Sequence, residues 1–304
     1  MSPRVSVGLP FYNGERFLEA AIDSLLGQTS ADFDLIISDN GSTDGTEAIC
    51  RRYANIDSRV RYYRSERNRG AAWNHNRVVE LASTPYFKWA AHDDICPPAF
   101  LERCADALDR EPSVILCYAR AVLINEEGRR LGPYSDRCAP GSADPYLRFR
   151  DLMETLALSN PMYGVIRTSV LRQTALLGSY PASDLVLLGE LALRGAFHLV
   201  PETLFFRRDH AQKSSRSNPA TAALANWYDP GNQDKIVLRY WRLLAEYFSG
   251  ITRTPMAPSA RARCYVYMLH WCRWNLRDLR RELRLAGTMV LRRARGADSV
   301  EAAR

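Results

Sequence analysis

The stretch that decides the fold is VSVGLPFYNGERFLEAAIDSLLGQTSADFDLIISDNGSTDGT, which occupies residues 5–46. It opens with a short apolar run at 5–9, places apolar residues at helical spacing over 15–28, and returns to an apolar run at 33–37. These patterns predict a strand, a helix and a second strand.

The alternation continues through the first 120 residues. The same patterns predict helices at 46–54, 71–82 and 98–109 and strands at 60–63, 86–91 and 114–119. Short connections between alternating elements predict an α/β fold with a mainly parallel sheet flanked by helices. Ligands of such sheets lie beyond the carboxyl ends of the strands, so the polar residues at 10–14, 39–45 and 92–94 are candidates for a site.

The rest of the chain is less regular. Residues 120–145 predict a loop or hairpin, and the polar residues 209–232 a long loop. Helices are predicted at 148–158, 168–177, 184–194, 233–249 and 259–285, and strands at 197–200 and 203–206. The chain thus predicts an α/β domain with a helical C-terminal extension.

Composition and charge exclude several classes of protein. No stretch approaches the roughly 18–20 apolar residues of a membrane-spanning helix, and the N-terminus shows no secretory pattern, so we expect a cytoplasmic protein. Seven scattered cysteines without a CxxC pair indicate neither a disulfide framework nor a zinc site. Residues 251–304 carry a net charge of +8 from twelve arginines and four acidic residues. The nearly neutral remainder has no nucleic-acid-binding motif, so we expect no nucleic acid partner.

Two adjacent carboxylates, Asp93 and Asp94, follow the apolar strand at 86–91. Their charges repel each other unless a cation or solvent offsets them. Mg²⁺ and Mn²⁺ prefer carboxylate oxygens and keep part of their shell for water and phosphate. The pair therefore indicates a metal site, and the alternative is a solvated turn or a cap on the helix that begins near Pro98.

The segment DNGSTDGT at residues 39–46 is dense in small hydrogen-bonding residues. It offers acceptors for a nucleobase or ribose and a backbone that a ligand can approach closely. A tight turn followed by a helix cap explains the same residues. From this segment alone, both interpretations stay open.

Four motifs together resemble the nucleotide-binding half of family 2 glycosyltransferases. They are VSVGLPFYNG at 5–14, DLIISDNGSTDGT at 34–46, NRG at 68–70 and HDD at 92–94. The resemblance implies a GT-A fold and an inverting transferase that moves a sugar from a UDP- or TDP-sugar to an acceptor hydroxyl. It also implies Mn²⁺ or Mg²⁺ as cofactor and a cell-surface polysaccharide, a glycolipid or another glycoconjugate as acceptor.

The resemblance assigns individual residues as well. The nucleoside would contact Pro10, Phe11, Tyr12, Asn13, Asp39, Asn40, Ser42 and Asn68, with Asp39 at the base. Asp93 would lie near the ribose and donor sugar, and Asp94 would hold the metal that bridges the diphosphate. The family more often has Asp-x-Asp or Asp-x-Asp-Asp here, so Ala91 and His92 are departures that leave open whether one or both carboxylates reach the metal.

An inverting transfer also needs a base that removes the proton of the acceptor hydroxyl. The family places it at the start of a helix, usually in an acidic pair, and PASDLVLLGELAL at 181–193 matches with Ser183 in place of the first acid. Asp184 is therefore the candidate base, and a simple helix cap is the alternative. Glu190 is the second candidate, but six residues along a helix turn about 240° round its axis, so it cannot point as Asp184 does.

The residues beyond 201 add further candidates. The segments at 207–210 and 214–216 carry Arg and His residues that could close over a diphosphate, as similar segments do in this family. His210 is a candidate for contact with the metal or diphosphate, and a structural role is its alternative. Trp73, Trp89 and Trp227 are candidates for stacking on an acceptor sugar or for packing.

The tail at 259–285 predicts an amphipathic basic helix. Its apolar stripe consists of Tyr265, Met268, Leu269, Cys272, Leu276, Leu279 and Leu283. Such a helix lies on an anionic membrane surface near a lipid-linked acceptor, or packs against the catalytic domain or a second subunit in a homodimer. The first alternative would make the protein peripheral on the inner face of the plasma membrane.

The predictions divide the chain into three parts. Residues 1–120 form the nucleotide-sugar-binding part, 121–229 the acceptor-binding and catalytic-base part of the same domain, and 230–304 the basic extension. A sugar nucleotidyltransferase would need a similar site, but such enzymes usually carry a Gly-rich loop with Arg or Lys, which residues 10–14 lack. A non-catalytic nucleotide-sugar-binding module is the other alternative, because Ser183 replaces one acid.

Overall fold

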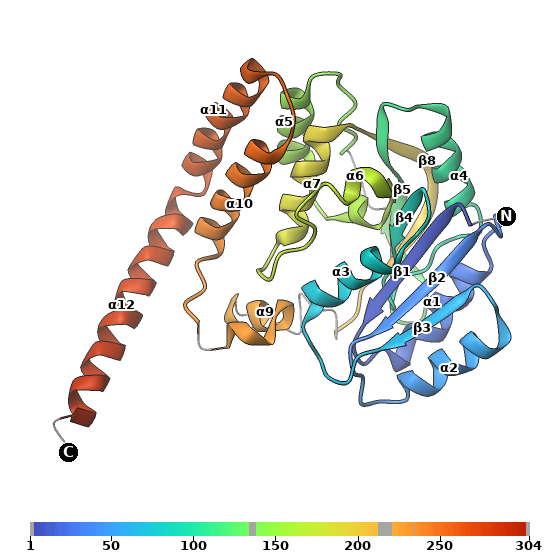
Figure 1. Cartoon of the computed structure of the whole chain (residues 1–304), viewed down its shortest axis with the longest axis horizontal. Helices are drawn as coiled ribbons and strands as arrows, with labels where there is room; N and C mark the ends of the chain where they lie inside the picture. Colours follow the sequence, from blue (N-terminus) through green and yellow to red (C-terminus); the bar gives the residue numbers. More distant parts are fainter. Residues whose placement is uncertain (1–2, 134–137, 212–220, 234, 302–304) are drawn as a thin grey trace.

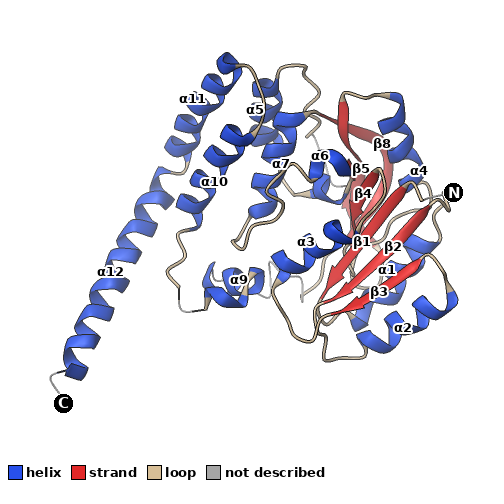
Figure 2. Cartoon of the chain, in the orientation of Figure 1, coloured by secondary structure: helices blue, strands red, loops and turns tan. Residues whose placement is uncertain are grey.

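The computed structural model of the protein describes residues 3–133, 138–211, 221–233 and 235–301. These residues form an eight-stranded sheet of order β3-β2-β1-β4-β7-β5-β6, in which β8 pairs with β5. Helices flank the sheet, and three long helices follow it at the C-terminal side (Figure 2). The predicted α/β fold with a helical extension is confirmed.

The first half of the sheet is parallel. Its strands are β1 (Val5–Phe11), β2 (Phe33–Asp39), β3 (Val60–Arg64) and β4 (Tyr86–Trp89). The helices between and after them are α1 (Glu15–Leu26), α2 (Thr46–Ile56), α3 (Ala71–Leu81) and α4 (Phe100–Arg110). Every strand and helix predicted up to this point is present, with ends that differ by a few residues.

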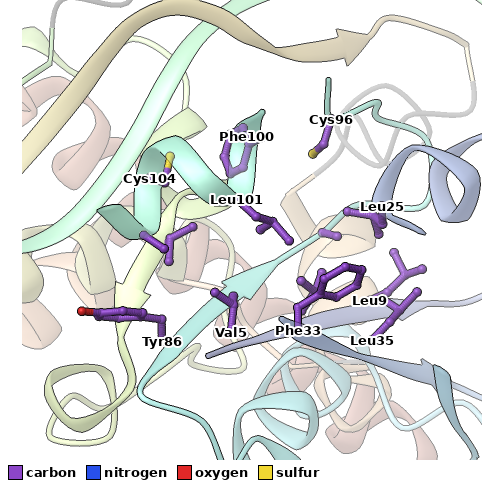
Figure 3. Packing of buried hydrophobic residues seen from close by; sticks show 14 of the residues in the cluster. Val5, Leu9, Leu25, Phe33, Leu35, Tyr86, Cys96, Phe100, Leu101 and Cys104 are labelled. Atoms are coloured by element: carbon purple, nitrogen blue, oxygen red, sulfur yellow. The ribbon is translucent and has the colours of Figure 1, made fainter. Parts of the chain in front are cut away.

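Strand β1 is buried on both faces, which explains its continuous apolar run. On one face, Leu9 belongs to the same core cluster as Leu25 of α1 and Leu101 of α4 (Figure 3). On the other face, Gly8 lets α3 approach closely, since a Cβ at this position would lie 2.7 Å from atoms of Val78. Packing on both faces of β1 thus holds the sheet between α1 and α4 on one side and α3 on the other.

The second half of the sheet is mixed. Strand β5 (Val114–Ile124) pairs in parallel with β8 (Ala196–Arg208) and antiparallel with β6 (Arg130–Pro133) and β7 (Val165–Arg167). The strands predicted at 197–200 and 203–206 are the single strand β8, and β7 was not predicted. The helix predicted at 168–177 is wrong beyond α6 (Thr168–Leu171), because the chain turns after this one helical turn. The remaining elements are α5 (Pro145–Thr155), the 3₁₀ turn η1 (Asn160–Tyr163) and α7 (Ser183–Arg194).

Two of the three C-terminal helices pack on the preceding domain: α10 (Arg239–Arg253) on α7 and α11 (Pro258–Trp274) on α5. The third, α12 (Leu276–Glu301), packs on α10 and α11, and Figure 1 shows it extending away from the sheet. The single helix predicted at 259–285 is wrong, because the chain breaks at Asn275 between α11 and α12. The loop predicted at 209–232 contains α9 (Thr221–Tyr228) and the 3₁₀ turn η2 (Pro230–Asn232). Among the described residues, no helix is both long enough and apolar enough to cross a membrane.

Candidate active site

The turns that follow β1 and β2 are tied together by hydrogen bonds. Phe11 and Asp39 are register partners at the ends of these parallel strands. Beyond them, the N–H of Asn13 donates to Oγ of Ser42 over 2.9 Å, and the N–H of Thr43 donates to Oδ1 of Asn13 over 2.9 Å. The two turns therefore form one continuous edge at the place where parallel sheets bind ligands.

Asp39 is fully buried at this edge. Its Oδ1 accepts a hydrogen bond from the N–H of Ser42 over 2.8 Å, and its Oδ2 accepts one from the hydroxyl of Tyr62 over 2.8 Å. Nε of Arg64 lies 3.3 Å from the same Oδ2. Burial, and then the hydrogen bond to Asp39, raise the pKa of Tyr62, so this hydroxyl stays a donor. Asp39 thus builds the turn, and its contact with a base stays a prediction.

Asn40 and Asn68 hold the NRG motif in place. Nδ2 of Asn40 donates to Oδ1 of Asn68 over 2.9 Å and to the carbonyl of Gly70 over 3.1 Å. Gly70 has a φ of 89°, in the left-handed region, and a Cβ there would collide with the carbonyl oxygen of Tyr228. These contacts explain the motif as the support on which α9 docks.

Tyr12, Asn13 and Asn68 are the exposed residues among the expected nucleoside contacts, and Tyr12 adds an aromatic ring. Its side chain is 42% exposed, whereas Pro10 and Phe11 are buried within β1. An exposed ring beside a polar turn suits stacking on a base.

Asp93 and Asp94 lie just beyond β4, where the chain forms a bridge to the end of β8. Oδ1 of Asp94 accepts a hydrogen bond from the N–H of Arg208 over 2.8 Å. Oδ2 of Asp93 lies 2.8 Å from Nε2 of His210. Strand β8 therefore brings His210 against the carboxylates, although more than 100 residues separate them in the sequence.

These side chains fit a divalent cation that is shared with a diphosphate. Nδ1 of the buried His210 has no hydrogen-bond partner among the described residues, and no three His, Cys, Asp or Glu side chains there could hold a metal by themselves. Hard cations are often bound by one or two carboxylates together with water and substrate phosphates. The interpretation of the carboxylate pair as a helix cap is wrong, because α4 begins after Ala99 without a side-chain cap.

The two arginines at the end of β8 differ in their contacts. Arg208 is buried and donates to the backbone carbonyl of Asp93 over 2.8 Å and to two carbonyls that follow β5. It supports these loops, so the expectation that it closes over a diphosphate is wrong. Arg207 donates to Oδ1 of Asn160 over 2.6 Å. The candidates at 214–216 lie outside the described residues.

Asp184 lies in the first turn of α7. The preceding Ala182 has a φ of 66°, a left-handed conformation that is uncommon for alanine, and no side chain caps the helix. The helix-cap interpretation of Asp184 is therefore wrong. The N-terminal turn of a helix favours a negative charge, so the position suits an ionised carboxylate.

Tyr163 lies between the elements that carry these carboxylates, although no pattern in the sequence singled it out. It ends η1, which lies against both β4, the strand that leads to Asp93 and Asp94, and α7, the helix that carries Asp184. Burial raises the pKa of Tyr163, the negative charge of Asp94 raises it further, and Arg207 partly offsets this effect. The sequence predicted neither η1 nor β7, so it could not place this side chain.

The charge of Asp184 acts on His75 of α3 and on Tyr228 of α9. Burial lowers the pKa of His75, and the hydrogen bond with the carbonyl of Ala71 and then Asp184 partly offset this effect. Burial and then Asp184 raise the pKa of Tyr228. Both side chains are therefore neutral near pH 7 and do not neutralise the candidate base.

The carboxylate of Glu190 is held by two arginines. Its side chain is 1% exposed and pairs with Arg194 over 2.8 Å and with Arg253 of α10 over 2.7 Å. Glu190 thus ties α7 to the C-terminal helices.

The three tryptophans have different surroundings. Trp89 is fully buried, so its stacking on an acceptor sugar is excluded. Trp73 is covered by the guanidinium of Arg69, 4.1 Å from its ring centre. Trp227 is partly exposed on α9 and stays a candidate.

Known proteins resemble this chain in sequence and in fold. Residues 6–172, more than half of the chain, match the model of glycosyl transferase family 2. The uncharacterized glycosyltransferase RT0329 of Rickettsia typhi is 31% identical over 131 residues, which are 43% of this chain and 40% of that protein. The chain thus spans about two fifths of the length of this relative.

Two solved structures share the fold. TarS 1–349 of S. aureus in complex with UDP-GlcNAc has a TM-score of 0.66 at 17% identity, and the match covers 88% of this chain and 71% of that one. The mannosyltransferase PcManGT from Pyrobaculum calidifontis, in complex with GDP-Man and Mn²⁺, has a TM-score of 0.56 at 16% identity, and the match covers 98% and 80%.

Proposed function

We propose that this chain, which belongs to glycosyl transferase family 2, is an inverting glycosyltransferase that moves a sugar from a nucleoside-diphosphate sugar to an acceptor hydroxyl. The observation that supports the proposal is that β8 brings His210 to within 2.8 Å of Asp93, beside Asp94 at the end of β4. This cluster suits a diphosphate with its cation, and Asp184 in the first turn of α7 would supply the base for the incoming hydroxyl.

In the proposed reaction, the acceptor oxygen attacks the anomeric carbon while its proton passes to the carboxylate of Asp184. The bond between the anomeric carbon and the diphosphate oxygen breaks, and the diphosphate leaves with the bonding electron pair. Attack from the side opposite to the leaving group inverts the anomeric configuration. Glu190 takes no part, because its carboxylate is held by Arg194 and Arg253.

On the donor side, Asp94, Asp93 and His210 would hold Mn²⁺ or Mg²⁺. Bound there, the cation would offset the charge that develops on the leaving diphosphate. Tyr12 would stack on the base, and the turn at Asp39 would contact the base edge. The likeness to structures with UDP-GlcNAc or with GDP-Man and Mn²⁺ supports a nucleoside-diphosphate sugar as donor and a divalent cation as cofactor.

For the substrates, we propose a UDP- or TDP-sugar and a hydroxyl of a polysaccharide, glycolipid or other glycoconjugate. A lipid-linked acceptor would place the enzyme at the inner face of the plasma membrane.

A panel of nucleotide sugars, tested by thermal unfolding with and without Mn²⁺, tests the proposal. A ligand at 100 times its dissociation constant stabilises the folded state by roughly 2.7 kcal/mol, which is about 4 °C for a chain of this length. We expect one sugar nucleotide to give such a shift only with the cation. Stabilisation by a nucleoside triphosphate and a sugar phosphate, with release of pyrophosphate, would instead support a nucleotidyltransferase. Binding without transfer to any acceptor would support the non-catalytic alternative.

A further inference from the structure

A basic recess lies at the break between α11 and α12. It is lined by Arg273, Trp274, Leu276, Arg277, Arg280, Arg281 and Arg284. Five guanidinium groups thus converge around a tryptophan and a leucine. Figure 1 shows this junction beside α10, away from the sheet and from the candidate active site.

One side of α12 is held against α10. Leu279 is buried, and Glu282 accepts hydrogen bonds from the N–H groups of Tyr240 and Trp241 at the start of α10. Nε1 of Trp241 donates to the carbonyl of Leu279 over 3.1 Å. These contacts fix which side of α12 faces the protein.

The arginines lie on the other side of the helix. At about 100° per residue, Arg277 and Arg281 fall roughly 160° from Leu279 around the helix axis, and Arg284 falls roughly 140° from it. Arg280 lies at a smaller angle of roughly 100°. The packed side is therefore occupied by Leu279 and Glu282, and the arginine ridge points outward.

The charge of this ridge is largely uncompensated within the protein. Asp278 pairs with Arg281 over 2.8 Å, and no other ion pair joins an arginine of the recess to a carboxylate of the described residues. Like charges at this spacing repel one another on a helix. An anionic partner would relieve the repulsion.

The apolar residues of the recess are also unusually exposed to solvent. Trp274 is 60% exposed and Leu276 is 41% exposed, and Leu283 is half-exposed about two turns further along α12. A tryptophan among arginines beside exposed leucines is the combination found where helices lie in the headgroup region of a membrane. A free soluble anion would use the arginines but would leave the apolar side chains in water.

We propose that the recess and the α12 ridge bind the phosphate headgroups of an anionic lipid bilayer, with Trp274 and Leu276 entering the headgroup region. The helix would lie on the surface, since no described helix is fit to cross a membrane. This inference deepens the proposed function, because it would hold the enzyme beside a lipid-linked acceptor.

Co-sedimentation of the full chain with vesicles tests the inference. The vesicles are phosphatidylcholine alone or a mixture with phosphatidylglycerol, at low and at physiological salt. The test variant is Arg277→Gln/Arg280→Gln/Arg284→Gln. The matched control is Arg52→Gln/Arg103→Gln/Arg110→Gln, which removes the same charge from exposed positions on α2 and α4.

We expect binding to the phosphatidylglycerol vesicles only, and more weakly as salt rises. Each arginine near an anionic surface contributes about fivefold, so the test variant should lose affinity on the order of 100-fold while the control keeps most of it. Trp274→Ala should also weaken binding to the vesicles, but the dependence of binding on salt should stay unchanged.

Three results would overturn the inference: no binding of the wild type to anionic vesicles at low salt, an equal loss in both triple variants, or a dimer in solution that only the test variant dissociates. The last result would assign the ridge to a second copy of the chain. Stabilisation by a sugar nucleotide, measured without vesicles, keeps this test separate from that of the proposed function, since the test variant should bind the donor as the wild type does.

Discussion

Substitutions of two carboxylates on α7 should have different effects: a change at Asp184 should lower catalytic activity, and a change at Glu190 should lower stability. In Asp184→Asn the side chain keeps its shape but loses the ability to take a proton. General-base catalysis contributes typically 10²–10⁴-fold, so turnover should fall by that order. Asp184 caps no helix end, and the loss of its interaction with the helix dipole should cost about 0.3–1 kcal/mol, or at most about 2 °C in melting temperature.

Glu190→Gln should lower stability and leave turnover nearly unchanged. It leaves Arg194 and Arg253 without their carboxylate at a site where the Glu190 side chain is 1% exposed. Breaking a buried ion pair costs about 3–5 kcal/mol, and the lower end applies because Arg253 is partly exposed. A loss of about 3 kcal/mol corresponds to about 5 °C for a chain of this length. Turnover well below the melting temperature should stay within a few-fold of the wild type.

The assay pairs thermal unfolding with the release of nucleoside diphosphate, both at a temperature where each variant is folded. Donor binding, followed as the shift in melting temperature with sugar nucleotide and Mn²⁺, should be nearly unchanged in both variants. The assignment fails if Glu190→Gln is inactive while folded and Asp184→Asn retains most of its turnover. Full turnover in both variants would count against catalysis by α7 altogether.

Three further predictions concern other parts of the site. Removal of divalent cations with EDTA, or Asp94→Ala, should abolish most binding of a nucleoside diphosphate in calorimetry, and unchanged affinity in either case would contradict the proposed metal site. Gly70→Ala should lower the melting temperature by several degrees, because the new Cβ would have a φ of 89° and meet the carbonyl of Tyr228; a neutral result would mean that α9 does not dock there. Burial lowers the pKa of His75 below its ordinary 6.5, so the unfolded chain takes up a proton more readily than the folded one. The free energy of unfolding should therefore fall as pH drops below about 6.5. His75→Gln should flatten this part of the curve of stability against pH, and an unchanged slope would contradict the prediction.

The sequence was most informative where local pattern and burial agree. The strands β1 and β2 are buried on both faces, so most of their residues are apolar and the two strands were easy to predict. In contrast, β7 has three residues and exists only because β4 and β5 lie on either side of it. The sequence did not predict the break at Asn275, because apolar residues continue at helical spacing across it. Such features depend on partners that are distant in the sequence.

The candidate site shows the same division. The motifs at 92–94 and 181–193 pointed to Asp94 and Asp184, and η1 lies against both β4, which leads to Asp94, and α7, which carries Asp184. The sequence did not show that Asp39 is already engaged by Tyr62 and Ser42, because those contacts depend on the pairing of β2 with β3 and on the exact turn. Motifs identify side chains, whereas the fold decides how much of their hydrogen-bonding capacity is left for a ligand.

Lys88 gives a physical reason why the two sides of the site should stay in register. Its side chain is fully buried in the middle of β4, where its Nζ donates to the carbonyl of Tyr163 over 2.6 Å and lies 4.3 Å from the ring centre of Phe100. A buried ammonium is costly unless its hydrogen bonds are kept, so this arrangement resists any shift of η1 relative to β4. Strand β4 leads directly to Asp93, and η1 also lies against α7, which carries Asp184. Lys88 thus helps to fix the carboxylates expected to hold the donor relative to the one expected to activate the acceptor.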